Sequence, residues 1–511
     1  MKWTATRWAD SLLWVFSGLV ILQTFSLILW YWPGALPDGP TSGVWTSLAY
    51  DFSKGIFYRP LMDETGYGGT RYMPLFFVLH GILIRLFDDP LTTGIFLTLL
   101  SSLFLNIGLY FVLRSFNLPA HIAFAFAVAI NATISYQLTT LNIRGDFLAA
   151  AFNIWGIWFA IRHKRLPSPA NLALAGLFFV LAFLTKLTTV FGLLAVIPYF
   201  WFSGPRPAAL KLFWGTALGY FLSLLAIHIL SDGRALESFL ACATGGMENT
   251  SPFRFIFHFF NEVLRDPIFF VLFALTLILF IASARNFWKE LPFLFFSTTF
   301  IFTLFIFSSP GTTSNHFIDL GAAMMLLLAL HFSRNPAWAK TISLAFPCIS
   351  AYIILSWFPP VPSIKKTLTQ NQKPTLETVA YFYKRYGQKA SPVLSHFTLF
   401  SILHGERPFA GDLFNLSLLT KKYPEIKKDF ERKIKDQFFG SIVTANWPVV
   451  FAKDIESRDD PDFAEKAAEY HRQQRGRFGG FYELIQQYYE ISSVRRPFVF
   501  YSPRGSTQPS P

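Results

Sequence analysis

Ionisable residues interrupt this strongly apolar chain at a few places, and any chemistry must be carried there. The segment 33–73 contains Asp38, Asp51 and the adjacent Asp63 and Glu64. Carboxylates of this kind can act as general bases or can bind a divalent metal ion. The alternative interpretation of their spacing is a tight turn that carries surface charges.

Two cations are candidates for binding an anionic group. Arg71 follows 68–70, where two glycines and a threonine free backbone N–H groups to turn towards a negative charge. Lys186 stands inside an apolar stretch, between Thr185 and Leu187. An isolated lysine there indicates a functional site, while snorkelling of its ammonium to the membrane interface is the alternative.

Two pairs of ionisable residues complete the candidate set. Arg144 and Asp146 open an apolar run, where they can anchor a helix end or reach into an outer cavity. His316 and Asp319 are three residues apart at a helix start, so they share one helix face. They can hydrogen-bond a sugar or position a proton acceptor, or they can simply form a helix N-terminus.

The composition places these residues in a membrane protein. Of 511 residues, 52% are hydrophobic and 15% are charged, and the mean hydropathy is +0.39. Soluble domains carry about 25% charged residues, so a purely soluble enzyme is excluded. The net charge of +13 lies largely in short loops between apolar runs, where it orients helices and does not indicate nucleic-acid binding.

The apolar runs predict an all-α polytopic membrane domain over 1–358, with about 11–13 transmembrane helices. A small α/β domain is expected over 359–511, where charges and tyrosines become frequent. One of the runs 74–87, 91–113 and 119–138 cannot cross independently, because the loops on either side of the three runs must lie on the same membrane face.

Basic residues at alternate loops, including the four residues 162–165, are expected in the cytoplasm. The protein is then a multi-pass protein of the plasma or inner membrane, with 359–511 outside the cytoplasm. Residues 42–55 and 252–265 are amphipathic and are expected to lie in the bilayer interface. The alternative, as well supported for 252–265, is a loop that packs on the membrane domain. In the soluble domain, the patterns predict helices over 375–386 and 419–438 and strands over 392–395, 440–444 and 497–501.

Nucleophile elbows, P-loops, zinc-protease motifs and dinucleotide fingerprints are absent from the sequence, so no nucleotide cofactor is expected. The order of the remaining motifs resembles the GT-C superfamily of integral-membrane glycosyltransferases, such as the protein O-mannosyltransferases and aminoarabinose transferases. Tyr72-Met73-Pro74 resembles the Tyr-x-Pro element after the first outer loop. Arg144-Gly145-Asp146 resembles an Arg-x-Asp element, and 175–186 resembles a helix that ends in Ala-Phe-x-x-Lys.

The resemblance implies an inverting glycosyltransferase with a sugar on a polyprenyl phosphate as donor. An acidic residue of the first outer loop would deprotonate the acceptor hydroxyl, and basic residues would neutralise the leaving phosphate. The predicted bases are Asp38, then Asp63, then Asp51, although the family acid normally opens the interfacial helix, where Ser42 stands here. The predicted substrate-binding residues are Glu64, Arg71, Tyr72, Arg144, Asp146, Lys186, His316 and Asp319.

We therefore expect Arg71, Asp146, Lys186 and His316 to converge around one chamber at the non-cytoplasmic membrane boundary. The expected partners are the membrane and a polyprenyl-phosphate sugar lipid, and a divalent metal ion is the one cofactor that the carboxylates can hold. The alternative function is non-catalytic binding of lipid-linked sugars or their transport, although the two halves show no hydropathy symmetry typical of transporters. The sugar and the acceptor are not specified by the sequence.

Overall fold

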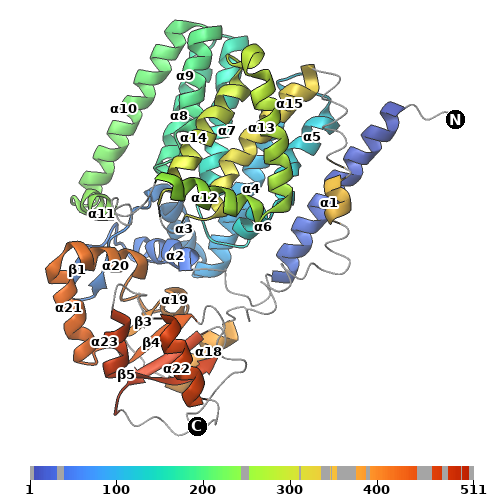
Figure 1. Cartoon of the computed structure of the whole chain (residues 1–511). Helices are drawn as coiled ribbons and strands as arrows, with labels where there is room; N and C mark the ends of the chain where they lie inside the picture. Colours follow the sequence, from blue (N-terminus) through green and yellow to red (C-terminus); the bar gives the residue numbers. More distant parts are fainter. Residues whose placement is uncertain are drawn as a thin grey trace.

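A helical bundle and a smaller mixed domain meet along the first outer loop (Figure 1). The computed structural model describes residues 5–31, 40–242, 252–309, 312–334, 346, 348–353, 376–386, 392–445, 463–474, 481–495 and 498–505. The expected boundary between the domains at 358 and 359 lies outside the described residues. The expected architecture, an all-α membrane domain with a small α/β domain after it, is confirmed.

The bundle is built from helices that begin where a proline ends the preceding loop. Proline occupies one of the first two positions of α3, α4, α8, α10, α13 and α14. Its missing N–H costs nothing there, because the first turn has no intrahelical acceptor. The helices are α1 Ala5–Tyr31, α2 Pro40–Ser53, α3 Pro74–Phe87, α4 Pro90–Arg114, α5 Ala120–Ala129, η1 Ile130–Ala132, α6 Ile134–Thr140, α7 Asp146–Arg165, α8 Pro169–Thr185, α9 Phe191–Ser203, α10 Arg206–Leu230, α11 Arg234–Cys242, α12 Pro252–Leu264, α13 Pro267–Phe287, α14 Leu291–Ile306, η2 Ser314–His316 and α15 Phe317–Arg334.

The centre of the bundle is α15. Every residue from Phe317 to His331 is buried, which a helix achieves only when neighbours cover it on all sides. Helix α10 lies at the periphery and exposes large apolar side chains such as Trp214 and Phe221. Apolar exposure of this extent suits contact with lipid chains and not with water.

Among the described residues, five helices are long and apolar enough to cross a membrane, and the broken segment from α5 to α6 can be a sixth. The protein is therefore an integral membrane protein. Five shorter apolar helices of 10–17 residues accompany them. The five long segments are Ser11–Leu29, Pro90–Arg114, Arg206–Leu230, Pro267–Phe287 and Ser314–Arg334.

One of the runs 74–87, 91–113 and 119–138 was expected not to cross the membrane. Two of these three runs are not single straight helices long enough to span it. Helix α3 has 14 residues, and at about 1.5 Å per residue it is shorter than the roughly 30 Å of a bilayer core. The run 119–138 breaks between η1 and α6, where the helix axis turns by 77°. The hydroxyl of Thr133 caps the new helix by accepting from Tyr136 N. The third run is α4, a continuous helix of 25 residues.

The two amphipathic segments are helical, but only one can face the bilayer. Helix α12 exposes 74% of Phe257 and packs Phe259 inward, as an interfacial helix does. Helix α2 is instead covered on both sides, by α3 and by the soluble domain, so Val44 and Trp45 are buried. The expectation that 42–55 lies in the bilayer interface is wrong for this reason.

The soluble domain is a four-stranded sheet with helices around it. The strand order is β3-β4-β6-β5, with β3 parallel to β4 and the other neighbours antiparallel. The predicted strands are found, but the single helix expected over 419–438 is two helices, because Pro424 cannot continue the first. The elements are α18 Leu376–Tyr386, β3 Val393–Ser395, α19 Leu399–Leu403, α20 Leu413–Lys422, α21 Pro424–Lys435, β4 Ser441–Ala445, α22 Phe463–Gln474, α23 Phe481–Tyr488, β5 Tyr489–Arg495 and β6 Phe498–Pro503.

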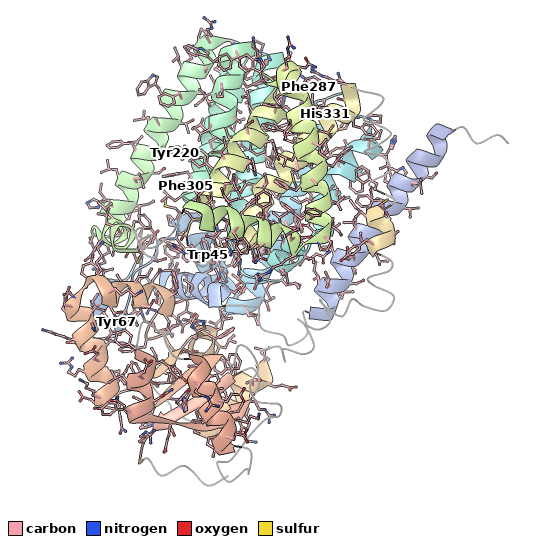
Figure 2. The ribbon with its side chains drawn as sticks, viewed as in Figure 1. Trp45, Tyr67, Tyr220, Phe287, Phe305 and His331 are labelled. Atoms are coloured by element: carbon pink, nitrogen blue, oxygen red, sulfur yellow. The ribbon has the colours of Figure 1, made fainter. Side chains whose placement is uncertain are left out.

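A hairpin of the first outer loop joins the two domains. Its strands, β1 Met62–Asp63 and β2 Gly66–Tyr67, lie against the soluble domain (Figure 1). Tyr67 N donates to Phe409 O at 2.8 Å, and the Tyr67 hydroxyl donates to Asp429 at 2.7 Å. Tyr67 lies at the opposite end of the molecule from Phe287 and His331 (Figure 2).

Replacing Gly66 by alanine is expected to weaken this joint. Gly66 has a φ of 139°, and an added Cβ would lie 1.9 Å from Phe409 O, so backbone must move. We expect a loss of about 1–3 kcal/mol from the strained φ alone. Gly55→Ala is the matched control, because Gly55 also has a positive φ but faces open space. Thermal unfolding in detergent and limited proteolysis between the domains measure the difference; equal effects of both variants would contradict this account.

Candidate functional site

A buried ion pair joins the beginning of α7 to the end of α8. Asp146 is the first residue of α7, and Lys186 follows the last residue of α8. The Lys186 ammonium donates to Asp146 Oδ1 at 2.6 Å. The lysine therefore points into the protein and does not snorkel to the interface, which was the alternative interpretation of its position.

The start of α15 adds two side chains to this pair. The Asn315 amide donates to Asp146 Oδ1 at 2.9 Å, and His316 Nδ1 lies 3.2 Å from the Lys186 ammonium. Asp319 faces the same region, where it accepts a hydrogen bond of 3.3 Å from Asn153 of α7. His316 and Asp319 thus share a face, as their spacing predicted.

Two arginines add positive charge. Arg71 and Arg144 lie close enough to interact electrostatically with His316, and Arg144 also with Asp146. In the part of the chain that the structure describes, neither arginine forms an ion pair with a carboxylate. We call the following residues the polar cluster: Arg71, Arg144, Asp146, Asn153, Lys186, Asn315, His316 and Asp319.

The polar cluster contains more cations than carboxylates. Its three permanent cations outnumber its own two carboxylates, Asp146 and Asp319, and Arg71 also interacts electrostatically with the Asp412 carboxylate of the soluble domain. Several buried atoms in and next to the cluster also lack a hydrogen-bond partner among the described residues: Arg144 Nε, Asn153 Oδ1, Thr188 Oγ1 and Thr189 Oγ1. Buried polar groups are almost always paired, so this concentration leaves hydrogen-bonding capacity that an anionic or polar ligand can use.

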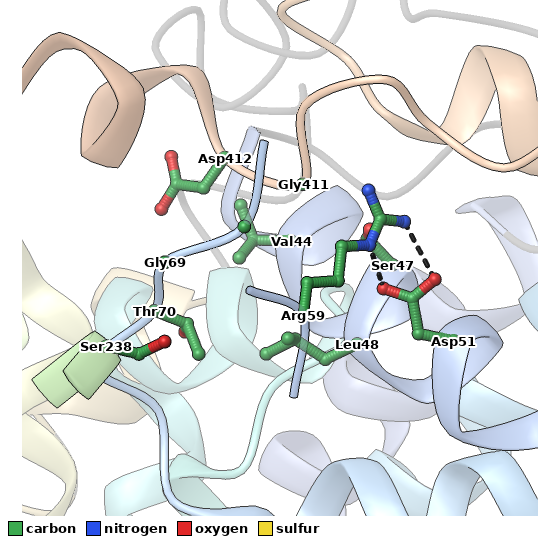
Figure 3. Close-up of a pocket in the computed structure, with 11 residues that line it drawn as sticks. Val44, Ser47, Leu48, Asp51, Arg59, Gly69, Thr70, Ser238, Gly411 and Asp412 are labelled. Atoms are coloured by element: carbon green, nitrogen blue, oxygen red, sulfur yellow. Dashed lines mark hydrogen bonds and ion pairs between the residues drawn. The ribbon is translucent and has the colours of Figure 1, made fainter. Parts of the chain in front are cut away.

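Asp51, the third predicted base, is instead held by two arginines. Arg59 donates to both of its oxygens, with Nη2 at 2.7 Å from Oδ1 (Figure 3). Arg407 Nε lies 3.1 Å from Oδ1. Arg59 also donates to Pro408 O at 2.6 Å. Because its lone pairs are occupied, Asp51 connects α2 to the first loop and the soluble domain and is poorly placed to take a proton.

The other first-loop acids lie elsewhere. Asp63 accepts from Thr65 N at 2.8 Å in the turn of the hairpin, and it interacts electrostatically with Arg407, which is not a member of the polar cluster. Glu64 is exposed on the same turn, so the structure does not bring it to the predicted substrate-binding residues. Asp38 lies outside the described residues.

Tyr72 lies between the first loop and the polar cluster. Its ring packs on Trp45 at 4.4 Å between centroids, and its phenol interacts electrostatically with Arg71 and Arg144. Asn153 and Asn315 were missed by sequence reasoning. The sequence feature that could have found them is an amide side chain inside or next to an apolar run.

Within the described residues no group of three or more His, Cys, Asp or Glu side chains could hold a metal ion.

Comparison with known proteins shows the fold. No family model matches the chain, and no curated protein sequence matches it either. ArnT from Cupriavidus metallidurans, solved with undecaprenyl phosphate, is 12% identical, with a TM-score of 0.62 over 98% of this chain and 99% of that one. The oligosaccharyltransferase AglB from Archaeoglobus fulgidus, solved with an inhibitory peptide and a dolichol-phosphate, is also 12% identical, with a TM-score of 0.56 over 96% of this chain and 73% of that one.

This chain has the fold of ArnT and AglB. The likeness extends through the soluble domain, because nearly all of the chain is covered in the comparison with ArnT. In this fold the polar cluster gathers residues of the first loop, of the ends of α7 and α8, of η2 and of the start of α15, on the side of the bundle that carries the soluble domain.

Removing Arg59 is expected to destabilise the protein strongly. Arg59→Met leaves Asp51 buried with Arg407 as its one remaining partner, and such losses cost about 3–5 kcal/mol. Adding Asp51→Asn removes the uncompensated charge, so the double variant should be more stable than Arg59→Met alone. Thermal unfolding of the two variants in detergent tests this, and a double variant that is less stable than the single one would contradict it.

Proposed function

We propose that this protein transfers a sugar from a polyprenyl phosphate to an acceptor hydroxyl, with inversion, on the membrane face that carries the soluble domain. The observation that supports the proposal is the polar cluster, which gathers Arg71, Arg144 and Lys186, with neither arginine in an ion pair among the described residues. A leaving phosphate needs this arrangement, because fixed cations stabilise the negative charge that develops as the bond to the sugar breaks.

The division of roles within the polar cluster follows from its contacts. Lys186 is held by Asp146 and so supplies a fixed ammonium. Arg71 and Arg144 have guanidinium groups free for bidentate contact with phosphate oxygens. Tyr72, His316 and Asp319 are then placed to contact the sugar. The solved GT-C structures that carry undecaprenyl phosphate or dolichol-phosphate make a lipid phosphate the natural occupant.

The orientation of the protein follows the same proposal. Phe287 and His331 lie at the end of the bundle away from the soluble domain (Figure 2). The Arg334 guanidinium lies 5.8 Å from the centre of the Phe287 ring and pairs with Glu290. Under the positive-inside rule, this end faces the cytoplasm and the soluble domain faces outward, in a plasma or inner membrane. Accessibility of single cysteines introduced at exposed positions of the soluble domain to a membrane-impermeant thiol reagent, added to sealed cells, measures the orientation.

Arg71→Met and Arg144→Met are expected to weaken binding of a polyprenyl phosphate by roughly tenfold to a hundredfold each, since hydrogen bonds to charged groups contribute about 1.5–3 kcal/mol. Neither arginine has a carboxylate partner among the described residues, so the fold should be retained. Arg285→Met is the matched control, because Arg285 is exposed at the end of α13. Native mass spectrometry of the protein in nanodiscs with undecaprenyl phosphate measures the affinity.

Turnover distinguishes the enzyme from a binder or flippase. Purified protein in lipid is incubated with radiolabelled polyprenyl phosphosugars and a membrane extract as the source of acceptors. Labelled acceptor and released polyprenyl phosphate are expected. Tight binding without release of polyprenyl phosphate would contradict a transferase and favour lipid-linked sugar binding or transport.

A further inference from the structure

A small cavity lies where α2, the first loop, α11 and the start of α20 meet (Figure 3). It has room for about one water-sized group, which is enough for a single hydroxyl. The polar groups around it come from four separate segments of the chain. Its lining includes Ser47, Gly69, Thr70, Ser238, Gly411 and Asp412.

Two hydroxyls in the cavity wall have no partner. Ser47 Oγ and Ser238 Oγ are buried, with 0% and 1% of each residue exposed, and neither forms a hydrogen bond in the described part of the chain. Leaving a buried hydroxyl unpaired costs about 1–3 kcal/mol. Two such groups facing one cavity indicate that a hydrogen-bonding ligand occupies it.

Asp412 supplies the only carboxylate in the cavity wall besides Asp51, which the two arginines hold. It caps α20, with Oδ1 accepting from Phe414 N at 2.9 Å and from Asn415 N at 3.3 Å. For Oδ2 the described residues provide no hydrogen bond. Figure 3 shows Asp412 beside Gly69, across the cavity from the pair of Asp51 and Arg59.

The first turn of α20 connects this cavity to the polar cluster. The Arg71 guanidinium lies 5.7 Å from the centre of the Phe414 ring, and the Asn415 amide donates to Gly69 O at 3.4 Å. Asp412 also interacts electrostatically with Arg71. A group in the cavity therefore lies next to the loop that carries a proposed phosphate-binding arginine.

We propose that the cavity binds the hydroxyl of the acceptor and that Asp412 takes its proton. This inference rests on the proposed function and replaces the first-loop acids as the site of the base. Asp412 belongs to the soluble domain, so the acceptor would arrive from the aqueous side and the donor from the bilayer.

The step balances without a further reactant. The acceptor oxygen forms a bond to the anomeric carbon of the sugar as the bond from that carbon to the phosphate oxygen breaks. The electron pair of the broken bond leaves on the polyprenyl phosphate, where Arg71 stabilises it. The hydroxyl proton passes to Asp412 Oδ2, and Ser47 and Ser238 donate hydrogen bonds to the acceptor oxygen or hold it in line.

Burial raises the pKa of the Asp412 carboxyl, while the backbone N–H groups of Asn415 and Phe414 and the charge of Arg71 lower it. Tyr72 and Cys242 are the other titratable groups that interact with it. A base must be deprotonated to act, so the transfer rate should fall as the pH falls through this pKa. A raised pKa places that fall at a higher pH than for an ordinary aspartate and makes the carboxylate a stronger base.

Asp412→Asn is the decisive variant, because asparagine also caps helices and should preserve the fold. Full-length protein in nanodiscs is given radiolabelled polyprenyl phosphosugars and membrane extract, and released polyprenyl phosphate is measured. We expect at least a hundredfold loss of turnover, the usual effect of removing a general base. Undecaprenyl phosphate should bind as tightly as to the wild type. Asp436→Asn, at an exposed acid of the same domain, is the matched control.

The outcomes separate this inference from the proposed function. Full turnover in Asp412→Asn, with turnover lost in Asp38→Asn, would return the base to the first loop and overturn the role of Asp412. Weakened undecaprenyl phosphate binding in Asp412→Asn would also overturn it, since the residue would then act on the donor. Wild-type protein that neither binds undecaprenyl phosphate nor releases it would refute the proposed function itself, and the role of Asp412 with it.

Discussion

The ion pair between Asp146 and Lys186 joins helix ends on the side of the bundle that carries the soluble domain. It ties the beginning of α7 to the end of α8, and Asn315 ties the start of α15 to the same carboxylate. Charges buried at this depth are tolerated only when paired and hydrogen-bonded, so these three helix ends cannot separate without a large cost. The cations are thereby held in place before any ligand arrives, which is what electrostatic stabilisation of a developing charge requires.

A second buried network connects this end of the bundle to the soluble domain. Asp51 of α2 is shared by Arg59 of the first loop and Arg407 of the soluble domain, and Tyr67 extends the connection through Phe409 and Asp429. The two networks have different consequences. The network around Asp146 holds Lys186 next to unpaired polar atoms. In the second network, the Asp51 carboxylate is fully occupied by two arginines, which fixes the position of the soluble domain.

Features encoded locally were predictable from the sequence. Apolar runs located most of the helices, and an isolated lysine in such a run marked Lys186 as a candidate, which the structure pairs with Asp146. The interaction of Asp51 with Arg407 spans 356 residues, and no local pattern reports such a partner. For the same reason α2 was expected at the bilayer interface, because its amphipathic pattern is the same whether lipid or a distant domain covers it.

One wall of the cavity comes from a domain that contributes nothing to the polar cluster itself. The first turn of α20 reaches the membrane boundary on a short loop, Pro408 to Asp412, that is held by backbone hydrogen bonds to the β2 strand. Changes in that loop would therefore alter the shape of the cavity while leaving the ion pair between Asp146 and Lys186 in place. The soluble domain can in this way vary one wall of the cavity while the helix ends of the bundle stay joined.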